Sequence, residues 1–378
     1  MMCVVAAMMM VSAGNANEKE QTDTVMQKKG IFAKIMQYFD ESNKEHPQKK
    51  WDVSVIGGPF YSSDSKLGLG VVGAGLYRMN GCEKDEQPSN VTLFGDVSTV
   101  GFCMIGLKGN NLFPEEKYRL NYMAYVYSFP SYYWGIGYEN GNNDANKTKI
   151  DRLQARVKVE FMVRAAENLY VGPSVMWDYA RAGNVKAEAL RLFDEMSLVQ
   201  RNYGVGVSVQ YDTRDYIYNA SKGVYVNLGQ EVRPMWLGND MAFSTTSMNV
   251  RAYKKVWKDG VVACDLNAVF NFGNPSWAMM AELGGASTMR GYYEGRYRDK
   301  HSMSVQVELR QHVWRRNGVV VWVGAGNVFD DRRTFKHILP NYGVGYRWEF
   351  KKRVNVRMDM GFGKRGQKGF VFNINEAF

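Results

Sequence analysis

The residues best suited to a chemical role are four consecutive ones, Met289, Arg290, Gly291 and Tyr292, within 273–300. This stretch is too polar and too rich in glycine to be a strand, so we expect a long loop. An arginine beside a turn glycine presents a planar guanidinium that pairs with a carboxylate through directional, charge-assisted hydrogen bonds. Glu308 stands on the polar face of the next strand-like run and is the expected partner. Such a pair would anchor the loop to the strand. The alternative is that Arg290 is an ordinary arginine of a surface loop.

The sequence carries no recognisable catalytic pattern. No G-x-S-x-G, H-E-x-x-H or P-loop motif occurs. The histidines are scattered along the chain: His46, His301, His312 and His337. Three cysteines lie beyond the N-terminal segment without CxxC spacing: Cys82, Cys103 and Cys264. We therefore expect no enzyme, no metal site and no cofactor, with an outward-facing Ser/His pair as the one catalytic alternative.

The elements that must position Arg290 and Glu308 are long strands. Apolar and polar residues alternate persistently from Asp52 onward, most clearly in 153–164, 262–272, 342–350 and 354–362. These runs last about ten residues, the length that crosses a bilayer at a tilt, whereas strands of soluble sandwiches average about five or six. The abundance of aromatic residues and glycine, with only 9 Pro, suits long twisted antiparallel strands.

The pattern predicts an all-β fold: a transmembrane antiparallel β-barrel of about sixteen strands over residues 51–378, in line with the strand lengths of such barrels. The strands are expected to begin near 52, 66, 90, 102, 117, 151, 168, 201, 222, 243, 260, 301, 318, 341, 353 and 369. Connections of one parity are short, and those of the other include longer links at 130–150, 180–200, 273–300 and 330–340. Barrels of the Gram-negative outer membrane have this asymmetry, so we expect an integral outer-membrane protein.

The N-terminal region is expected to be separate from the barrel. Residues 1–16 contain a short apolar core and a small-x-small cleavage site, which indicates a signal peptide. Residues 17–50 are polar and are expected in the periplasm, with a possible amphipathic helix over 25–43. A disordered tether is the alternative for this segment.

The net charge of +10 does not indicate nucleic-acid binding. Lys and Arg are spread singly through the alternating runs and never gather into a basic helix or arm. A solvated basic lumen or a rim facing anionic lipid accounts for them, so outer-membrane lipids are the expected surroundings.

The last residues, 369–378, form an alternating run that ends on an aromatic residue. One face of this run carries Phe370, Phe372, Ile374 and Phe378. It resembles the C-terminal signal by which outer-membrane barrels are recognised for assembly. Glu376 departs from that signal, because a hydrophobic or aromatic residue usually stands there.

Three stretches together resemble the barrel of the BamA/TamA family (bacterial surface antigen), the outer-membrane insertase and translocase class. The first is a strand followed by Asp212, Thr213, Arg214 and Asp215, similar to the family's strand–DTRD–turn–strand. The second is the Met289–Tyr292 stretch, followed by Glu308-Leu309-Arg310, similar to the V/L-R-G-F/Y loop motif and its E-x-R strand. The third is Gly324–Asp330 with the closing glycine-rich strands. The resemblance implies that the loop folds into the barrel lumen and is held there through Arg290.

Two departures bear on what the resemblance implies. Family members often carry an acidic residue where Gly324 stands, so one expected partner of Arg290 is missing. Members that insert or export proteins usually carry POTRA domains before the barrel, whereas residues 17–50 are too few for one, which indicates a short member.

Three functions are compared, and the first two stay open at this stage. The first is assistance to insertion or translocation of outer-membrane or surface proteins, with assembly machinery or client proteins as partners. Opening between the first and last strands would offer an edge to a client strand, and Gly57-Gly58-Pro59 would weaken the first strand's pairing. The second is a passive pore or scaffold subunit without insertase activity. The third is the barrel enzyme already described as the catalytic alternative.

Overall fold

A computed structural model describes residues 51–79, 81, 88–217, 219–332, 336–351 and 353–378. The expected signal peptide, the segment 17–50 and Cys82 lie outside these residues. Of the remaining cysteines, Cys103 and Cys264 are free thiols.

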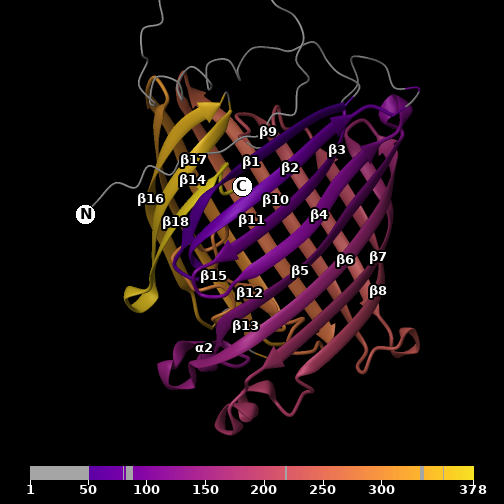
Figure 1. The fold of residues 1–378 in the computed structure, drawn as a ribbon, viewed down its shortest axis with the longest axis vertical. Helices are drawn as coiled ribbons and strands as arrows, with labels where there is room; N and C mark the ends of the chain where they lie inside the picture. The colour runs from indigo at the N-terminus through magenta and orange to yellow at the C-terminus, as the bar shows by residue number, and fades with distance from the viewer. Residues whose placement is uncertain (1–50, 80, 82–87, 218, 333–335, 352) are drawn as a thin grey trace, which may run out of the picture.

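The described residues form a closed antiparallel barrel of sixteen strands, which confirms the predicted fold class (Figure 1). Each predicted strand start lies within three residues of an observed one. The barrel strands are β1 (Trp51–Ser62), β2 (Lys66–Tyr77), β3 (Ser89–Ser98), β4 (Cys103–Leu112), β5 (Tyr118–Tyr133), β6 (Thr148–Ala166), β7 (Leu169–Gly183), β8 (Val199–Asp212), β9 (Gly223–Arg233), β10 (Phe243–Trp257), β11 (Gly260–Gly273), β14 (His301–Trp314), β15 (Asn317–Phe329), β16 (Leu339–Lys351), β17 (Val354–Gly363) and β18 (Lys368–Ile374).

The barrel turns its apolar residues outward and its polar residues inward. In β6, Val157 and Phe161 are exposed, whereas Gln154 on the opposite face is buried. In β14, Val305 and Val307 are exposed, whereas Glu308 is fully buried. This is the reverse of a soluble sandwich and matches a wall with lipid outside and a polar lumen inside. The alternation that predicts the strands is therefore the signature of a membrane barrel.

The two ends of the barrel differ in the length of their connections. One end, here called the turn end, includes the two-residue turns 167–168, 258–259 and 315–316. The other end, here called the loop end, carries the longest connections, among them 274–300. It lies at the bottom of Figure 1, where α2 (Tyr138–Asn142) is labelled. By the rule that outer-membrane barrels have short periplasmic turns and longer external loops, we assign the loop end to the outside.

The helical pieces are short and lie in the connections. They are α2 and the 3₁₀ turns η1 (Pro114–Glu116), η2 (Asp144–Asn146), η3 (Ala187–Phe193), η4 (Met235–Leu237) and η5 (Lys364–Gly366). None of the described helices is long and apolar enough to cross a membrane.

The loop between β11 and β14 is more ordered than its composition suggests. No barrel strand runs through it, but it contains a two-stranded ribbon, β12 (Ala281–Leu283) paired with β13 (Tyr297–Asp299). Both strands are largely buried. Backbone N–H and C=O groups enclosed in the barrel must find partners, and pairing the two arms of the loop satisfies them. The expectation that this stretch holds no strand is therefore wrong for six of its residues.

Candidate functional site

The tip of the loop lies against the inner wall at β17 and β18. Met289 and Gly291 both have positive φ, 52° and 109°, which turns the chain sharply on either side of Arg290. A Cβ on Gly291 would lie 2.7 Å from the carbonyl carbon of Gly361 in β17. Only glycine permits this approach, because any side chain would enter the backbone of the wall. The turn aims the Arg290 side chain along the wall toward β14.

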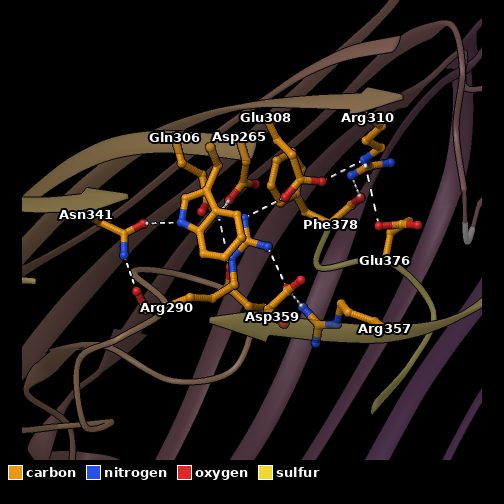
Figure 2. A network of polar contacts seen from close by, with 12 residues as sticks. Asp265, Arg290, Gln306, Glu308, Arg310, Asn341, Arg357, Asp359, Glu376 and Phe378 are labelled. Atoms are coloured by element: carbon orange, nitrogen blue, oxygen red, sulfur yellow. Dashed lines mark hydrogen bonds and ion pairs between the residues drawn. The ribbon is translucent and has the colours of Figure 1, made fainter. Parts of the chain in front are cut away.

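Arg290 is fully buried and bridges two strands of the wall (Figure 2). Its Nη2 donates to Oε2 of Glu308 in β14 at 2.5 Å, and its Nη1 donates to Oδ2 of Asp359 in β17 at 2.7 Å. Both carboxylates are also fully buried. The two terminal nitrogens of the guanidinium thus connect one point on the loop to β14 and β17. These two strands lie on either side of β15 and β16.

The face of the guanidinium and the backbone of Arg290 are also occupied. The guanidinium carbon lies 3.6 Å from the ring centroid of Trp322 in β15, a cation–π contact. Asn341 in β16 contacts both Trp322 and Arg290. Its Oδ1 accepts from Trp322 Nε1 at 2.9 Å, and its side-chain amide donates to the Arg290 carbonyl. Four consecutive strands, β14 to β17, therefore contact this one residue.

The ion pairs continue from Arg290 to the end of the chain by two routes. On one route, Glu308 Oε1 accepts from Arg310 Nε at 2.7 Å, and Arg310 Nη2 donates to the carbonyl of Phe378 at 2.8 Å. On the other, Asp359 accepts from Arg347 Nη1 at 2.5 Å, and Arg347 Nε donates to Glu376 at 2.7 Å.

Arg357 completes the cluster, with Nη1 at 3.3 Å from Asp359 and 3.0 Å from the Ala286 carbonyl of the loop. Four guanidinium groups thus meet three carboxylates, those of Glu308, Asp359 and Glu376. Buried charges are tolerated when they are paired and hydrogen-bonded in this way.

The neighbours of Arg290 in the motif pack and hydrogen-bond on either side. Met289 is buried in an apolar cluster whose other members are Tyr138, Leu283, Tyr292, Tyr297, Val328 and Leu339. The Tyr292 hydroxyl donates to the Pro340 carbonyl at 2.5 Å and accepts from the Lys364 amide at 2.7 Å. The motif therefore joins the loop to β16 and to the β17–β18 hairpin as well.

Glu308, the expected partner, contacts Arg290, but sequence reasoning missed Asp359, Arg347 and Glu376. The acidic residue absent at Gly324 has a counterpart in Asp359, two strands further round the barrel. Its signal was present in the alternation of 354–362, which places Asp359 on the polar face. Sequence spacing alone cannot say which of several inward carboxylates a loop reaches.

The end of the chain is not a continuation of the last strand. β18 ends at Ile374, and Asn375 turns with φ 72°. Phe378 then lies buried in a cluster with Ala220, Tyr253, Ala263 and Ala377. The expectation that Phe378 shares a face with Phe370, Phe372 and Ile374 is therefore wrong, because this turn breaks the alternation.

The acidic side chain of Glu376 lies inside the lumen. It therefore does not interrupt the apolar surface that faces outward. Whether Phe370, Phe372, Ile374 and Phe378 form an assembly signal stays a prediction.

The Asp212–Asp215 stretch lies at the turn end, away from the loop tip. Asp212 accepts from the backbone and side chain of Arg214, whose guanidinium covers the Tyr225 ring at 4.3 Å. Asp215 accepts from the Ser221 and Lys222 amides and from Arg353 Nη1 at 2.9 Å, in the β16–β17 turn. Burial alone would raise the pKa of Asp215, but the hydrogen bonds from Ser221 and Lys222 outweigh it and lower the pKa to about 2. This stretch fastens two connections at the turn end to each other.

Each of the histidines His301, His312 and His337 contacts an acidic side chain or a backbone carbonyl. His301 contacts Asp331 at 2.9 Å, His312 contacts the Arg315 carbonyl, and His337 contacts Glu139 at 3.0 Å. Within the described residues no group of three or more His, Cys, Asp or Glu side chains comes together as a metal site.

The barrel closes through a weak seam between its first and last strands. In Figure 1 the yellow β18 lies beside the indigo β1. In the part of the chain that the structure describes, β1 pairs with β18 at Tyr61↔Phe372 and Ser62↔Val371, both at the loop end. Two further bonds join Ser63 and Phe370: the Ser63 amide donates to the Phe370 carbonyl at 3.1 Å, and the Phe370 amide donates to Ser63 Oγ at 2.9 Å. From Trp51 to Phe60 the strand has partners in β2 alone.

A lumenal loop held by an arginine, beside a weakly paired seam, is the arrangement that the sequence resemblance implies. The model of the Omp85 superfamily domain matches residues 110–378. The chain belongs to the Omp85 superfamily. Membership of this superfamily and the closed sixteen-strand barrel together indicate an outer-membrane protein.

Solved structures of Omp85 barrels share the fold at low sequence identity. BamA from Haemophilus ducreyi lacking POTRA domains 1–3 is 12% identical, with a TM-score of 0.57 over 86% of this chain and 70% of that chain. CdiB from Escherichia coli is 11% identical, with a TM-score of 0.56 over 87% of this chain and 64% of that chain. This Omp85 chain therefore spans less than two thirds of that CdiB. No curated protein matches its sequence.

Proposed function

We propose that this Omp85 barrel assists the insertion or translocation of outer-membrane or surface proteins by opening laterally between β1 and β18. An opened seam exposes the edge of β1, whose unpaired N–H and C=O groups pair with a strand of the client protein. The partners of this activity are client proteins and the assembly machinery that delivers them.

The observation that carries the proposal is the contrast in pairing on the two sides of β1. The strand pairs with β2 at twelve positions and with β18 at two. Gly57, Gly58 and Pro59 lie in the part of β1 that has no β18 partner. Proline has no N–H to donate and glycine weakens a strand, so this part of the seam is poorly suited to close.

The inward course of the chain end supports the same function. Residues 375–378 turn into the lumen, so they do not extend β18 along β1. The Arg347–Glu376 and Arg310–Phe378 contacts hold them there. The anchored loop and the last strand are thus joined through one buried network, which couples the position of the loop to the state of the seam.

The test is depletion of the protein from its bacterium, followed by quantitative comparison of the outer-membrane proteome. Complementation uses wild type and Tyr61→Cys/Phe372→Cys, in a background with Cys82, Cys103 and Cys264 replaced by serine. We expect other barrels or surface proteins to decrease on depletion and to recover with wild type. The cysteine pair is expected to restore them only under reducing conditions, because a disulfide prevents opening.

Two outcomes would count against insertion. An unchanged proteome after depletion would exclude a general role, and full complementation by the oxidised pair would exclude lateral opening. A matched control, Met248→Cys/Ala268→Cys, joins β10 to β11 at paired positions away from the seam. It is expected to complement whether oxidised or reduced.

A non-insertase barrel is the second candidate, and the buried network favours it. Arg290 and its partners hold the loop to four strands at once, as a rigid scaffold subunit would require. A passive pore predicts steady conductance in planar bilayers, whereas a lumen filled by the loop predicts small, irregular conductance. Co-purification of a stable partner with an unchanged proteome would favour the scaffold.

A further inference from the structure

A cavity of about 450 Å³ lies at the loop end, beside the paired part of the seam. Four pieces of the chain line it: the β1–β2 turn, the anchored loop, the β17–β18 hairpin and the β5–β6 connection. Sites for small molecules commonly measure about 300–1,000 Å³. Ser62 lines it from β1 and Val371 from β18, so a molecule in this cavity contacts both sides of the seam.

The lining carries more cations than carboxylates. Lys66 follows the β1–β2 turn on one side of the seam, Lys368 begins β18 on the other, and Lys147 and Arg296 come from the two loops. Asp64 is the one carboxylate among the lining residues. Positive charges gathered round a concave surface attract an anion.

The existing partners do not neutralise these cations. Arg296 pairs with Asp144, whose side chain is 80% exposed, at 2.9 Å. Asp64, which lies near Lys66, accepts from the Glu294 amide at 3.0 Å. Burial raises the pKa of Asp64 to about 6, so this carboxyl stays largely ionised at neutral pH and offsets only one of the four cations. In the described part of the chain, Lys147 and Lys368 form no ion pair with a carboxylate.

Aromatic rings form another part of the lining. Trp134 and Tyr293 lie with ring centroids 5.4 Å apart, and Lys147 Nζ lies 4.1 Å from the centroid of Tyr132 beside them. Trp134 is buried, and its indole N–H has no acceptor among the described residues. A buried donor of this kind usually finds a partner. The cavity therefore combines cations with aromatic side chains.

We propose that this cavity binds a phosphorylated saccharide and that the bound molecule braces the loop end of the seam. Phosphate oxygens accept charge-assisted hydrogen bonds from Lys66 and Lys368 across the seam. A sugar ring presents apolar C–H faces to Trp134 and Tyr293. The volume exceeds that of a bare phosphate. The bracing half of this proposal rests on the proposed lateral opening; the binding half does not.

The binding test uses the full chain in lipid nanodiscs and four probes. Soluble glucosamine disaccharide bisphosphate, the same disaccharide without phosphate, and inorganic phosphate are titrated calorimetrically. The fourth probe is lipid A built into the nanodisc, with phosphatidylglycerol nanodiscs as reference. We expect the bisphosphate to bind at least about tenfold more tightly than either fragment, because charge and ring contacts act together. Competition by embedded lipid A would identify the outer-leaflet glycolipid as the source, and its absence a free sugar phosphate.

Variants locate the binding in the cavity. Lys66→Gln/Lys368→Gln is expected to weaken bisphosphate binding by about tenfold or more, since both charge-assisted contacts are lost. The matched control, Lys149→Gln/Lys186→Gln, removes the same charge from exposed loop-end lysines outside the lining and is expected to change binding less than about twofold. Absence of saccharide binding, equal binding of inorganic phosphate, or equal loss in both variants would overturn the binding proposal.

Bracing is measured separately, by hydrogen exchange of the Ser63 and Phe370 amides across the seam. Bound bisphosphate is expected to slow their exchange by about threefold or more, since the ligand contacts both strands. Tight binding with unchanged exchange would overturn bracing alone. Neither measurement uses a client protein, so failure here and failure of the insertase function are distinguishable.

Discussion

Two pairs of neighbouring strands in the wall of this barrel are built from similar strands but differ in how completely they pair. β5 and β6 pair at sixteen positions in register, from Tyr118↔Val163 to Tyr133↔Thr148. β1 and β18 pair at two positions in the described residues. Both are antiparallel neighbours in the same closed sheet, so strand chemistry alone does not explain the difference. β5 and β6 are consecutive strands joined by the connection 134–147, whereas β1 and β18 lie at opposite ends of the barrel sequence and meet only after the whole sheet has curled.

The comparison also shows what the buried network does. Strands β14 to β17 lie next to the seam and are held together by Arg290 and its partners, whereas the seam itself receives no such cross-link in the described residues. The fold thus joins a rigid wall to a weak edge. The proposed opening between β1 and β18 rests on this arrangement.

Hydrogen exchange gives the largest expected contrast. In nanodiscs, seam-facing amides of β1 between Val55 and Phe60 should exchange about a hundredfold or more faster than amides of β5, because local opening needs few broken bonds there. The β2-facing amides of β1 are the internal control and should resemble β5. Equal protection on both faces of β1 would mean that the seam is as closed as the other pairs.

Removing Arg290 tests how much the buried network stabilises strands β14 to β17. Arg290→Ala leaves Glu308 and Asp359 buried with fewer partners, and losing one partner of a buried ion pair costs about 3–5 kcal/mol. We expect about 3 kcal/mol of lost stability, since Arg310 and Arg347 remain. Urea unfolding in lipid vesicles, followed by tryptophan fluorescence, measures the change.

A second loop arginine serves as the control. Arg296→Ala breaks a pair with the exposed Asp144 and should cost about 1 kcal/mol or less. Arg290→Lys should be intermediate, because an ammonium cannot span both carboxylates or stack flat on Trp322. If the two alanine variants were equally stable, the network would not be what holds the loop.

Releasing the chain end should have a moderate effect. Glu376→Gln removes the charge that pairs with Arg347 and lies 3.9 Å from Arg310. We expect Ala377→Cys in this background to react with a maleimide about five- to tenfold faster, because the segment leaves the lumen more often. The rate in otherwise wild-type protein is the reference, and an unchanged rate would show that apolar packing of Phe378 alone holds the segment.

The pH dependence of the loop should be the smallest effect. Burial raises the pKa of Glu294 to about 7, with added repulsion from Glu282 and Asp64 and partial relief from Arg152 and Arg298. A pKa raised by folding means that the folded state prefers the protonated carboxyl. This contribution is present below about pH 4.5 and is lost as the pH rises through about 7.

We therefore expect the thermal midpoint to fall between pH 5 and pH 8. Glu294→Gln should flatten this profile and raise the midpoint at pH 8. Lys186→Gln, at an exposed pair with Glu188 outside this group, is a control that should leave the profile unchanged. A midpoint that rises with pH in wild type would contradict the assignment.

Local patterns were sufficient to predict every strand of the barrel. Leu153 to Val163 alternates with Gln154 to Arg164 because one face meets lipid and the other meets the lumen, and this requirement acts on each residue separately. Residue types and order also indicated the long loop and made Glu308 a candidate partner of Arg290, whereas the preference for this pair over an ordinary surface arginine came from the family resemblance. The alternation gave a wrong prediction for residues 375–378, because a left-handed turn at Asn375 changes the direction of the Phe378 side chain.

The sequence by itself determined that this protein is a sixteen-strand membrane barrel with an arginine loop, because period-2 patterning and turn chemistry are local properties. Only the tertiary structure decided that Asp359 is the second partner of Arg290, that Glu376 and Phe378 lie in the lumen, and that the seam pairs at two positions. These features join residues far apart along the chain. They depend on the curvature and register of the whole sheet, which no short stretch of sequence contains.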